Sequence, residues 1–553
     1  MKRVIIALLA AAVSGVAAYG GQDPPAGTSA PTARISGRIV DAASGQPIEH
    51  ALLRLVSFDV RRVARSAGTD AEGRFTFGDL VPGRYQLTGS APGYLAQQFG
   101  QRVVFEPGRP IDLAERQHFA RANFALARPG SIEGVLRDEF GDPAPGIAVR
   151  VSRPAFAAGR RRLMPLSGST PGSTTNDQGR FRIANLSPGS YYVTALAGVF
   201  ADPNAPGGFA PTFHPGTPQV GVAMPVVVGP GQQVSGIDFT LVPVPTVALS
   251  GRFVDGGGQP VPRASYIFMA HDSTGASALA IVRGLADGDG RFALRNVPAG
   301  QYTIQAFGRP EGGGNLGKAP FGWLTVSVAD REVSDLEVRI VPGTKAAGRI
   351  VLEGGQSVPL APKQVAVLPR PVEFESAPIA GGPPNFEVRD DWTFQVDNMS
   401  GLRVVRASVA SPGWTLKRVM LRGQDVTDTP LDFATGDVND LEVVLTTNVS
   451  TLSGSVTDAT GAPVADCSVV VFAVDQARWT YPSRYIALAR PNQAGEFRVA
   501  GLPAASYVAV ALRFVEGAQG QDPEFLEQIR ALGTVVFVLE GQSQAVQLRL
   551  AER

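Results

Sequence analysis

The stretch "TDAEGRFTFGDLVPGRYQL", Thr69 to Leu87, decides the fold because it recurs in register along the chain. Counted from its glycine, a phenylalanine lies at +2, an aliphatic residue at +7 and a tyrosine at +12. Four copies keep the glycine, phenylalanine and tyrosine of this pattern: Gly73, Phe75 and Tyr85; Gly179, Phe181 and Tyr191; Gly290, Phe292 and Tyr302; Gly495, Phe497 and Tyr507. A fifth, divergent copy counts from Trp392 and has lost the tyrosine. Such spacing indicates internal repeats.

A second motif opens each repeat, as in "ISGRIVDAASGQPIEHALLRL". Its glycines are Gly37, Gly134, Gly251, Gly348 and Gly454, which lie 97 to 117 residues apart. These intervals have the size of domains and are too long for a solenoid repeat. The sequence therefore predicts five units at 33–127, 128–243, 246–342, 344–447 (divergent) and 450–553.

Local patterns predict strands in each unit. Ile35 and Ile39 alternate with polar residues, which is the period of a half-buried strand. In "DAEG" the acid can bond to backbone two residues on, while the glycine takes the left-handed conformation. Tyr85, placed after the next turn, can bury its ring while its hydroxyl reaches a nearby backbone group. About seven strands per unit predict an all-β array of antiparallel β-sandwiches, with one helix at 522–533.

The motif "SGRIVD…GQPI…TDAEGRFTFGDLVPGRYQLTGSAPGY" resembles the carboxypeptidase regulatory-like domain, a transthyretin-like Greek-key sandwich grouped with carbohydrate-binding-like folds. The resemblance covers nearly all of the chain after its first residues, and implies about five tandem copies. In metallocarboxypeptidases this domain accompanies a separate catalytic domain and carries no catalytic residues itself. The resemblance also extends to the N-terminal extension of some outer-membrane receptors, although no barrel is expected after Arg553.

Composition narrows the functional classes. The net charge is +1 and the basic residues are dispersed, which argues against a nucleic-acid partner. The N-terminus reads as an export signal at 1–18, followed by a linker at 19–32, so we expect an exported protein without a transmembrane segment after cleavage. Its destination would be the periplasm, the cell surface or the medium. The single cysteine, Cys467, excludes an internal disulfide, and its alternating surroundings predict a buried side chain.

No constellation for catalysis, metal binding or a cofactor emerges. The four histidines lie in separate stretches without the spacing of a zinc peptidase, and no nucleophile elbow or phosphate-binding loop occurs. "DGDGRF" (287–292) resembles part of a calcium loop but lacks the further oxygen ligands, so we interpret it as the recurring turn. We therefore expect no catalytic residues, no metal, no cofactor and no enzyme activity.

Aromatic residues outside the repeat pattern are the candidate ligand contacts: Trp323, Trp414, Trp479 and Tyr481. Sugars can stack on such rings, and loops at the ends of sandwiches commonly carry binding sites. The alternative is that these rings pack under loops or between units. The sequence thus predicts a non-catalytic exported protein that binds a glycan or an envelope protein, or else a structural spacer. An enzyme site built between units is the third hypothesis. The ligand and the oligomeric state are not encoded in any recognisable motif.

Overall fold

The computed structural model describes residues 33–552 apart from 58–63, 103–105, 158, 167–172, 198–207, 271–280, 310–318, 355–358, 374–377, 379–385, 412 and 516. The predicted signal peptide (1–18) and linker (19–32) lie outside the described residues. The five units are referred to below by the order and bounds predicted above. Strands dominate throughout, and the single α-helix of the described residues is α1 (Pro523–Arg530), inside the predicted helical segment.

Each unit contains a sheet in which the opening strand is flanked by two partners. The opening strand pairs antiparallel with the strand that carries the repeat phenylalanine. On its other side, the opening strand pairs parallel with the closing strand of the unit. In the first three units these sheets contain β4 (Arg74–Leu80), β1 (Ala33–Asp41), β8 (His118–Phe119) and β9 (Phe124–Leu126); β14 (Arg180–Leu186), β10 (Gly130–Arg137), β18 (Gln233–Val234) and β19 (Phe239–Thr240); and β23 (Arg291–Pro298), β20 (Thr246–Val254) and β26 (Val333–Arg339).

The second sheet of these units contains the strand with the repeat tyrosine. Its members are β2 (Leu52–Ser57), β3 (Ala64–Gly68), β5 (Gly83–Ser90), β6 (Gln97–Gln98) and β7 (Ile111–Leu113); β11 (Ala148–Ala157), β12 (Arg160–Pro165), β13 (Ser173–Thr174), β15 (Gly189–Leu196), β16 (Thr212–Phe213) and β17 (Val226–Val228); and β21 (Ser265–Ala270), β22 (Ile281–Leu285), β24 (Gly300–Phe307) and β25 (Phe321–Val328).

The last two units keep the flanked opening strand and extend the sheets. The fourth contains β29 (Phe386–Val388), β30 (Thr393–Met399), β27 (Thr344–Glu353), β35 (Val438–Thr446), β32 (Thr415–Leu421) and β33 (Gln424–Asp425), over β28 (Val365–Pro371), β31 (Leu402–Val409) and β34 (Leu431–Asp432). The fifth is one continuous sheet of β38 (Ile486–Ala489), β37 (Ser468–Ala473), β40 (Ala505–Leu512), β42 (Ser543–Ala551), β36 (Thr451–Thr457) and β39 (Glu496–Ala500), with β41 (Thr534–Val538) on β40. All-β tandem sandwiches are thus confirmed. The expectation that they are antiparallel is wrong in one respect, because the closing strand of each unit pairs parallel with the opening strand.

The recurring residues have defined structural tasks. The opening glycine lies opposite the repeat phenylalanine in every unit, as Gly37 does opposite Phe75 and Gly454 opposite Phe497. A Cβ on any of these five glycines would overlap a backbone carbonyl of the closing segment. The motif therefore keeps glycine because the closing backbone occupies the space of a side chain.

The predicted turns and tyrosine contacts are present. Asp70 Oδ1 accepts from the amides of Glu72 (3.1 Å) and Arg74 (2.7 Å), and Gly73 has φ of +73°. In each complete copy the tyrosine hydroxyl donates to the carbonyl four residues earlier, as from Tyr507 to Pro503 (2.7 Å). The repeat spacing therefore fixes a turn, a strand and a hydroxyl–carbonyl bond in each sandwich.

A further repeat position escaped sequence reasoning. Six residues after the turn position, every unit has a residue with positive φ: Asp79, Asn185, Asn296, Asn398 and Gly501. In four units the strand register shifts next to this residue. Aspartate, asparagine and glycine adopt this conformation at lower cost than other residues, which explains their use at this position.

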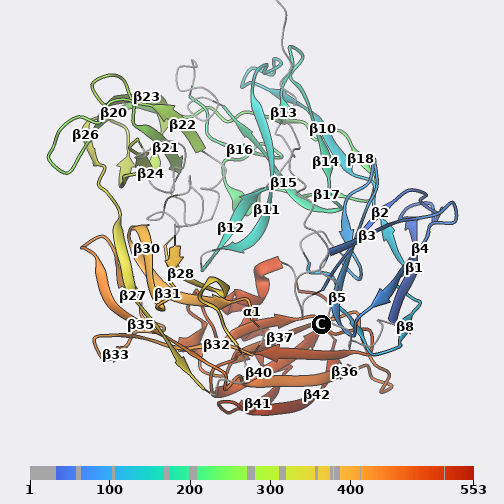
Figure 1. Cartoon of the computed structure of the whole chain (residues 1–553). Helices are drawn as coiled ribbons and strands as arrows, with labels where there is room; N and C mark the ends of the chain where they lie inside the picture. The colour runs from blue at the N-terminus through green and yellow to red at the C-terminus, as the bar shows by residue number, and fades with distance from the viewer. Residues whose placement is uncertain are drawn as a thin grey trace, which may run out of the picture.

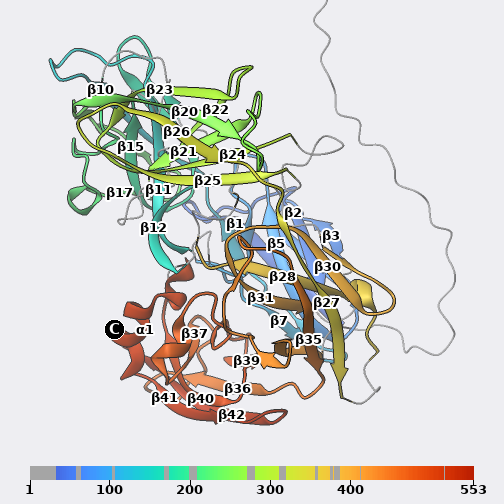
Figure 2. The same cartoon turned by 90° about the vertical axis from the view of Figure 1, so that its left-hand side faces the viewer.

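Figure 1 shows that the five units form a closed round, in which the fifth unit (red) returns to the first (blue). Hydrogen bonds join these two units although they are the farthest apart in sequence. The Asp112 amide donates to Gln493 Oε1 (3.1 Å), and Asn492 Nδ2 donates to Asp112 Oδ2 (2.9 Å). Figure 2 shows the same neighbourhood from the side, with β7 close to β39 and β12 reaching towards α1. Contacts between units that are not consecutive were not expected from the sequence, which suggested units joined only end to end.

Candidate functional site

A cavity of about 680 Å³ lies where the second, fourth and fifth units meet. We call it the central cavity. Its walls combine aromatic rings with charged side chains, among them Phe156, Arg160, Arg406, Asp428, Arg478 and Tyr481. No single unit could form it, because each unit contributes only one wall.

The segment after β37 sets the aromatic wall of the central cavity. Asp475 caps the short 3₁₀ turn Gln476–Trp479, since its side chain accepts from the amide of Ala477 (3.1 Å). Trp479 then turns inward, where its Nε1 donates to the Ala473 carbonyl (2.7 Å) and only 4% of the residue is exposed. The turn leaves Tyr481 half-buried on the wall.

Guanidinium groups form the polar wall. Arg406 and Arg484 share one carboxylate, with Nη2 of Arg406 at 3.0 Å and Nε of Arg484 at 3.1 Å from the Asp428 oxygens. Burial lowers the pKa of Arg406, and the Asp428 charge opposes that shift. Arg478 lies over the ring of Tyr485, with its guanidinium carbon 4.7 Å from the ring centre. The cavity thus offers charged hydrogen-bonding groups of both signs beside flat aromatic surface.

The four aromatic candidates from the sequence do not form one row. Trp479 and Tyr481 both line the central cavity, although Trp479 is almost fully buried. Trp414 is half-buried against the core of the fourth unit. Trp323 is 43% exposed on β25 of the third unit. Sequence reasoning missed the arginines of the cavity, although Arg478 stands in the same "QARWTYPSRYI" stretch as the aromatic residues.

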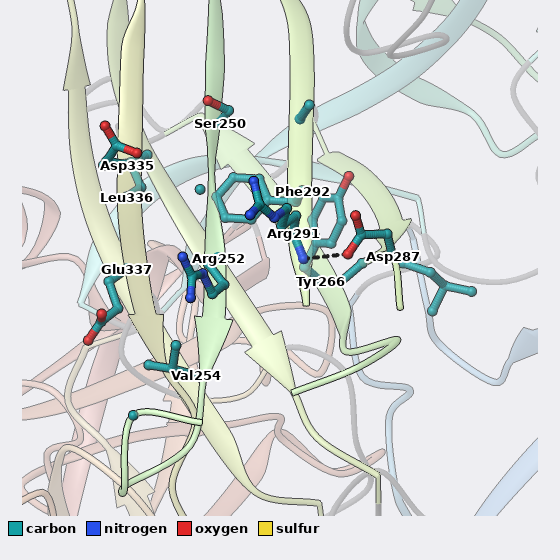
Figure 3. A pocket seen from close by; sticks show the side chains of 15 residues that line it. Ser250, Arg252, Val254, Tyr266, Asp287, Arg291, Phe292, Asp335, Leu336 and Glu337 are labelled. Carbon is teal, nitrogen blue, oxygen red and sulfur yellow. Dashed lines mark hydrogen bonds between the residues drawn. The ribbon is translucent and has the colours of Figure 1, made fainter. Parts of the chain in front are cut away.

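A second kind of hollow follows from the repeat itself. Figure 3 shows it in the third unit, where about 720 Å³ lies along β20, β23 and β26 beside Gly251. Arg252 and Glu337 flank it, and the amide of Arg291 donates to Asp287 Oδ1 (2.7 Å) within the recurring turn. The equivalent hollow of the fifth unit, about 540 Å³, is flanked by two residues of the first unit.

The described residues hold no group of three histidine, cysteine, aspartate or glutamate side chains placed to bind a metal ion. None of the described helices has both the length and the apolar character required to cross a bilayer. Burial raises the pKa of the Cys467 thiol to about 11, which keeps this thiol protonated at neutral pH.

Comparison with known proteins identifies the sandwich. The profile of the carboxypeptidase regulatory-like domain matches residues 34–127 and 131–242. Among curated proteins, none matches this sequence.

Several solved structures with partial similarity are pilins. The minor pilin GBS52 of Streptococcus agalactiae is 14% identical, with a TM-score of 0.24 over 38% of this chain and 97% of its own. The major pilin subunit BcpA of Bacillus cereus is 12% identical, with a TM-score of 0.14 over 56% of this chain and 99% of its own. The shaft pilin spaA of Lactobacillus rhamnosus GG is 12% identical, with a TM-score of 0.15 over 39% of this chain and 98% of its own. At this level the solved structures bear on neither the function nor the assembly of this chain.

The family match agrees with the geometry described above. The matched segments contain the opening glycine, the capped turn and the tyrosine–carbonyl bond, and the three later units repeat the flanked opening strand. The first two units therefore match the carboxypeptidase regulatory-like domain, and the three later units share the flanked opening strand of these two.

Proposed function

We propose that the protein is a non-catalytic, exported binding protein whose central cavity holds a carbohydrate of the cell envelope. The observation that carries this proposal is the lining of the cavity, where Tyr481 and Tyr485 lie beside Arg406 and Arg478. Sugars present an apolar C–H face to aromatic rings and hydroxyl groups to hydrogen-bond donors. The volume of about 680 Å³ falls in the range of small-ligand sites.

The closed round of units supports a binding role because it holds the cavity walls in place. Arg406 Nη2 donates to the Pro482 carbonyl (2.7 Å), which joins the fourth unit to the aromatic segment of the fifth. Arg161 Nε donates to Asp522 Oδ2 (2.5 Å), which joins the second unit to the fifth. A preformed cavity loses less conformational entropy on binding than one that must assemble.

A glycan screen of the chain without its first 32 residues tests this proposal, followed by calorimetry of any hit. We expect Tyr481→Ala to weaken binding at least about tenfold, the size of effect measured when a stacking or buried contact is truncated. Trp323→Ala is the matched control, because this aromatic residue is exposed on another unit. Absence of binding to every glycan, or equal losses for both variants, would refute the proposal.

A protein-assembly role is the second candidate, and one surface favours it. Strand β41 pairs only with β40 among the described strands. Val535 and Phe537 on its outer face are 54% and 67% exposed, and Leu539, directly after the strand, is 56% exposed. An exposed apolar edge strand is a common site of strand pairing between chains. Light scattering of the native protein and of Phe537→Asp separates the candidates. A larger particle that the substitution dissociates supports assembly, whereas a monomer in both cases contradicts it.

A further inference from the structure

A second cavity of about 420 Å³ lies where the first, second and fifth units meet. We call it the junction cavity. The first unit contributes Arg102, Arg109 and Phe124, the second contributes Pro188, and the fifth contributes Asp466. It shares no lining residue with the central cavity among those described.

The charges around the junction cavity do not balance. Glu106 is buried and forms ion pairs with both Arg102 (2.7 Å) and Arg490. Asp466 lies 3.3 Å from Arg490 and 3.6 Å from Arg102. The carboxylates of Glu106 and Asp466 thus form ion pairs with the guanidinium groups of Arg102 and Arg490. The guanidinium of Arg109 is a third cation on the cavity wall.

Arg109 has no carboxylate within ion-pair distance among the described residues. Its Nε atom is buried without a hydrogen-bond partner, and its one close side-chain contact is the ring of Phe99, 4.7 Å from the guanidinium carbon. Burial lowers the pKa of Arg109, and the charge of Arg490 lowers it further, against the attraction of Asp466. An arginine has five N–H donors, and the Nε donor of Arg109 is the one that is buried without a partner. Such a group destabilises the empty protein unless something else supplies the missing charge.

Other lining residues complement this cation. Asn123 Oδ1 accepts from the amide of Arg38 (2.8 Å), while its Nδ2 donates to no group among the described residues. The ring of Phe124 and the ring of Pro188 provide apolar surface on the same walls. The cavity thus places one unpaired cation and a free amide donor beside a small apolar face.

We propose that the junction cavity binds a small carboxylate that also carries hydroxyl groups, such as a hexuronate. Arg109 then donates to the carboxylate, for which its planar guanidinium is suited, and Asn123 Nδ2 donates to a hydroxyl. The C–H face of the ligand lies against Phe124 and Pro188. This site is independent of the carbohydrate site proposed for the central cavity.

Titration calorimetry of the chain without its first 32 residues tests the site, with glucuronate as the probe. Three comparison ligands are used. Glucose lacks the carboxylate, benzoate lacks the hydroxyls, and inorganic phosphate is a simple anion. We expect saturable binding of glucuronate and at least about tenfold weaker binding of each comparison ligand. Glucose leaves the cation without its partner, benzoate lacks the hydroxyl that accepts from Asn123, and phosphate lacks the apolar C–H face.

Arg109→Gln should weaken glucuronate binding at least about tenfold. Arg54→Gln, which changes an exposed arginine of the same unit, should leave it unchanged. A merely structural Arg109 would lower thermal stability when replaced, whereas the proposed role predicts that Arg109→Gln raises the unfolding temperature of the free protein. Asn123→Ala provides a second, smaller loss of binding without altering a charge.

Equal affinity for glucose and glucuronate, tighter binding of phosphate or benzoate, no binding of glucuronate, or unchanged affinity in Arg109→Gln would each overturn the proposal. Tyr481→Ala should leave glucuronate binding intact. A failure of the central-cavity proposal is thereby distinguished from a failure of this one.

Discussion

Replacing Glu106 by glutamine should loosen the contact that closes the round of units. The Glu106 side chain is 1% exposed and that of Arg490 is 3% exposed, so this ion pair between the first and fifth units is buried. Arg490 Nη2 also donates to the Gly100 carbonyl (2.8 Å) and lies 3.3 Å from Asp466. After the substitution, Arg490 and Arg102 lose the buried carboxylate that both contact and keep only the partly exposed Asp466.

The size of the effect follows from these contacts. Breaking a buried ion pair by removing one partner costs about 3–5 kcal/mol. Arg490 keeps the partly exposed Asp466, so we expect the lower end, about 3 kcal/mol, which corresponds to a shift on the order of 100-fold in the closing equilibrium. Because Arg490→Gln removes the stranded cation, the double variant should recover part of the loss, and the double-mutant cycle gives the coupling energy.

Hydrogen exchange of β7 and β39 provides the measurement, since both strands lie at this contact. Protection should fall at these strands in Glu106→Gln, while the core strand β24 of the third unit keeps its protection. Glu133→Gln is the control, because the Arg182–Glu133 pair is exposed (57% and 37%) and should contribute under about 1 kcal/mol. Unchanged exchange at β7 in Glu106→Gln, or an equal effect in the control, would refute the closing role of this ion pair.

Three further substitutions test the repeat. Gly454→Ala places a Cβ against the backbone of Val546, so we expect a loss of about 3 kcal/mol or more in urea unfolding, whereas Gly68→Ala, in open space, should be nearly neutral. Tyr507→Phe removes a hydroxyl–carbonyl bond from a buried ring and should cost about 1 kcal/mol in the same assay; a stabilised variant would contradict that bond's role. Backbone and side-chain hydrogen bonds, led by the amide of the residue three positions on, lower the pKa of Asp41 below 3.8, so its contribution is present above about pH 4 and lost on acidification. Asp41→Asn should therefore reduce stability at pH 7 and flatten acid unfolding, and an unchanged acid profile would argue against this linkage.

The fold was predictable because its determinants are local. Gly73 and Asp70 define a turn, Phe75 faces inward from the next strand, and Tyr85 reaches a carbonyl four residues before it. Each of these relations spans fewer than about twenty residues, so it leaves a spacing that can be counted along the sequence. The positive φ at Asp79 is equally local, and aligning the five copies would have found it.

The candidate sites were less predictable. Tyr481 was recognised as an aromatic residue outside the repeat pattern, but its neighbours across the central cavity come from other units. Arg109 stands in "EPGRP", which carries no motif, and its significance depends on carboxylates of distant segments that pair with other arginines. A charge without a partner is a property of the folded arrangement and leaves no pattern in the sequence.

The sequence by itself determined the repeat and the all-β class, since turns, glycine contacts and the tyrosine bond act within one sandwich. Only the tertiary structure decided that the fifth unit returns to the first through Glu106 and Arg490, and that two cavities lie between the units. Surfaces that meet across hundreds of residues are selected by shape and charge complementarity, which depend on atoms brought together only after each sandwich has folded.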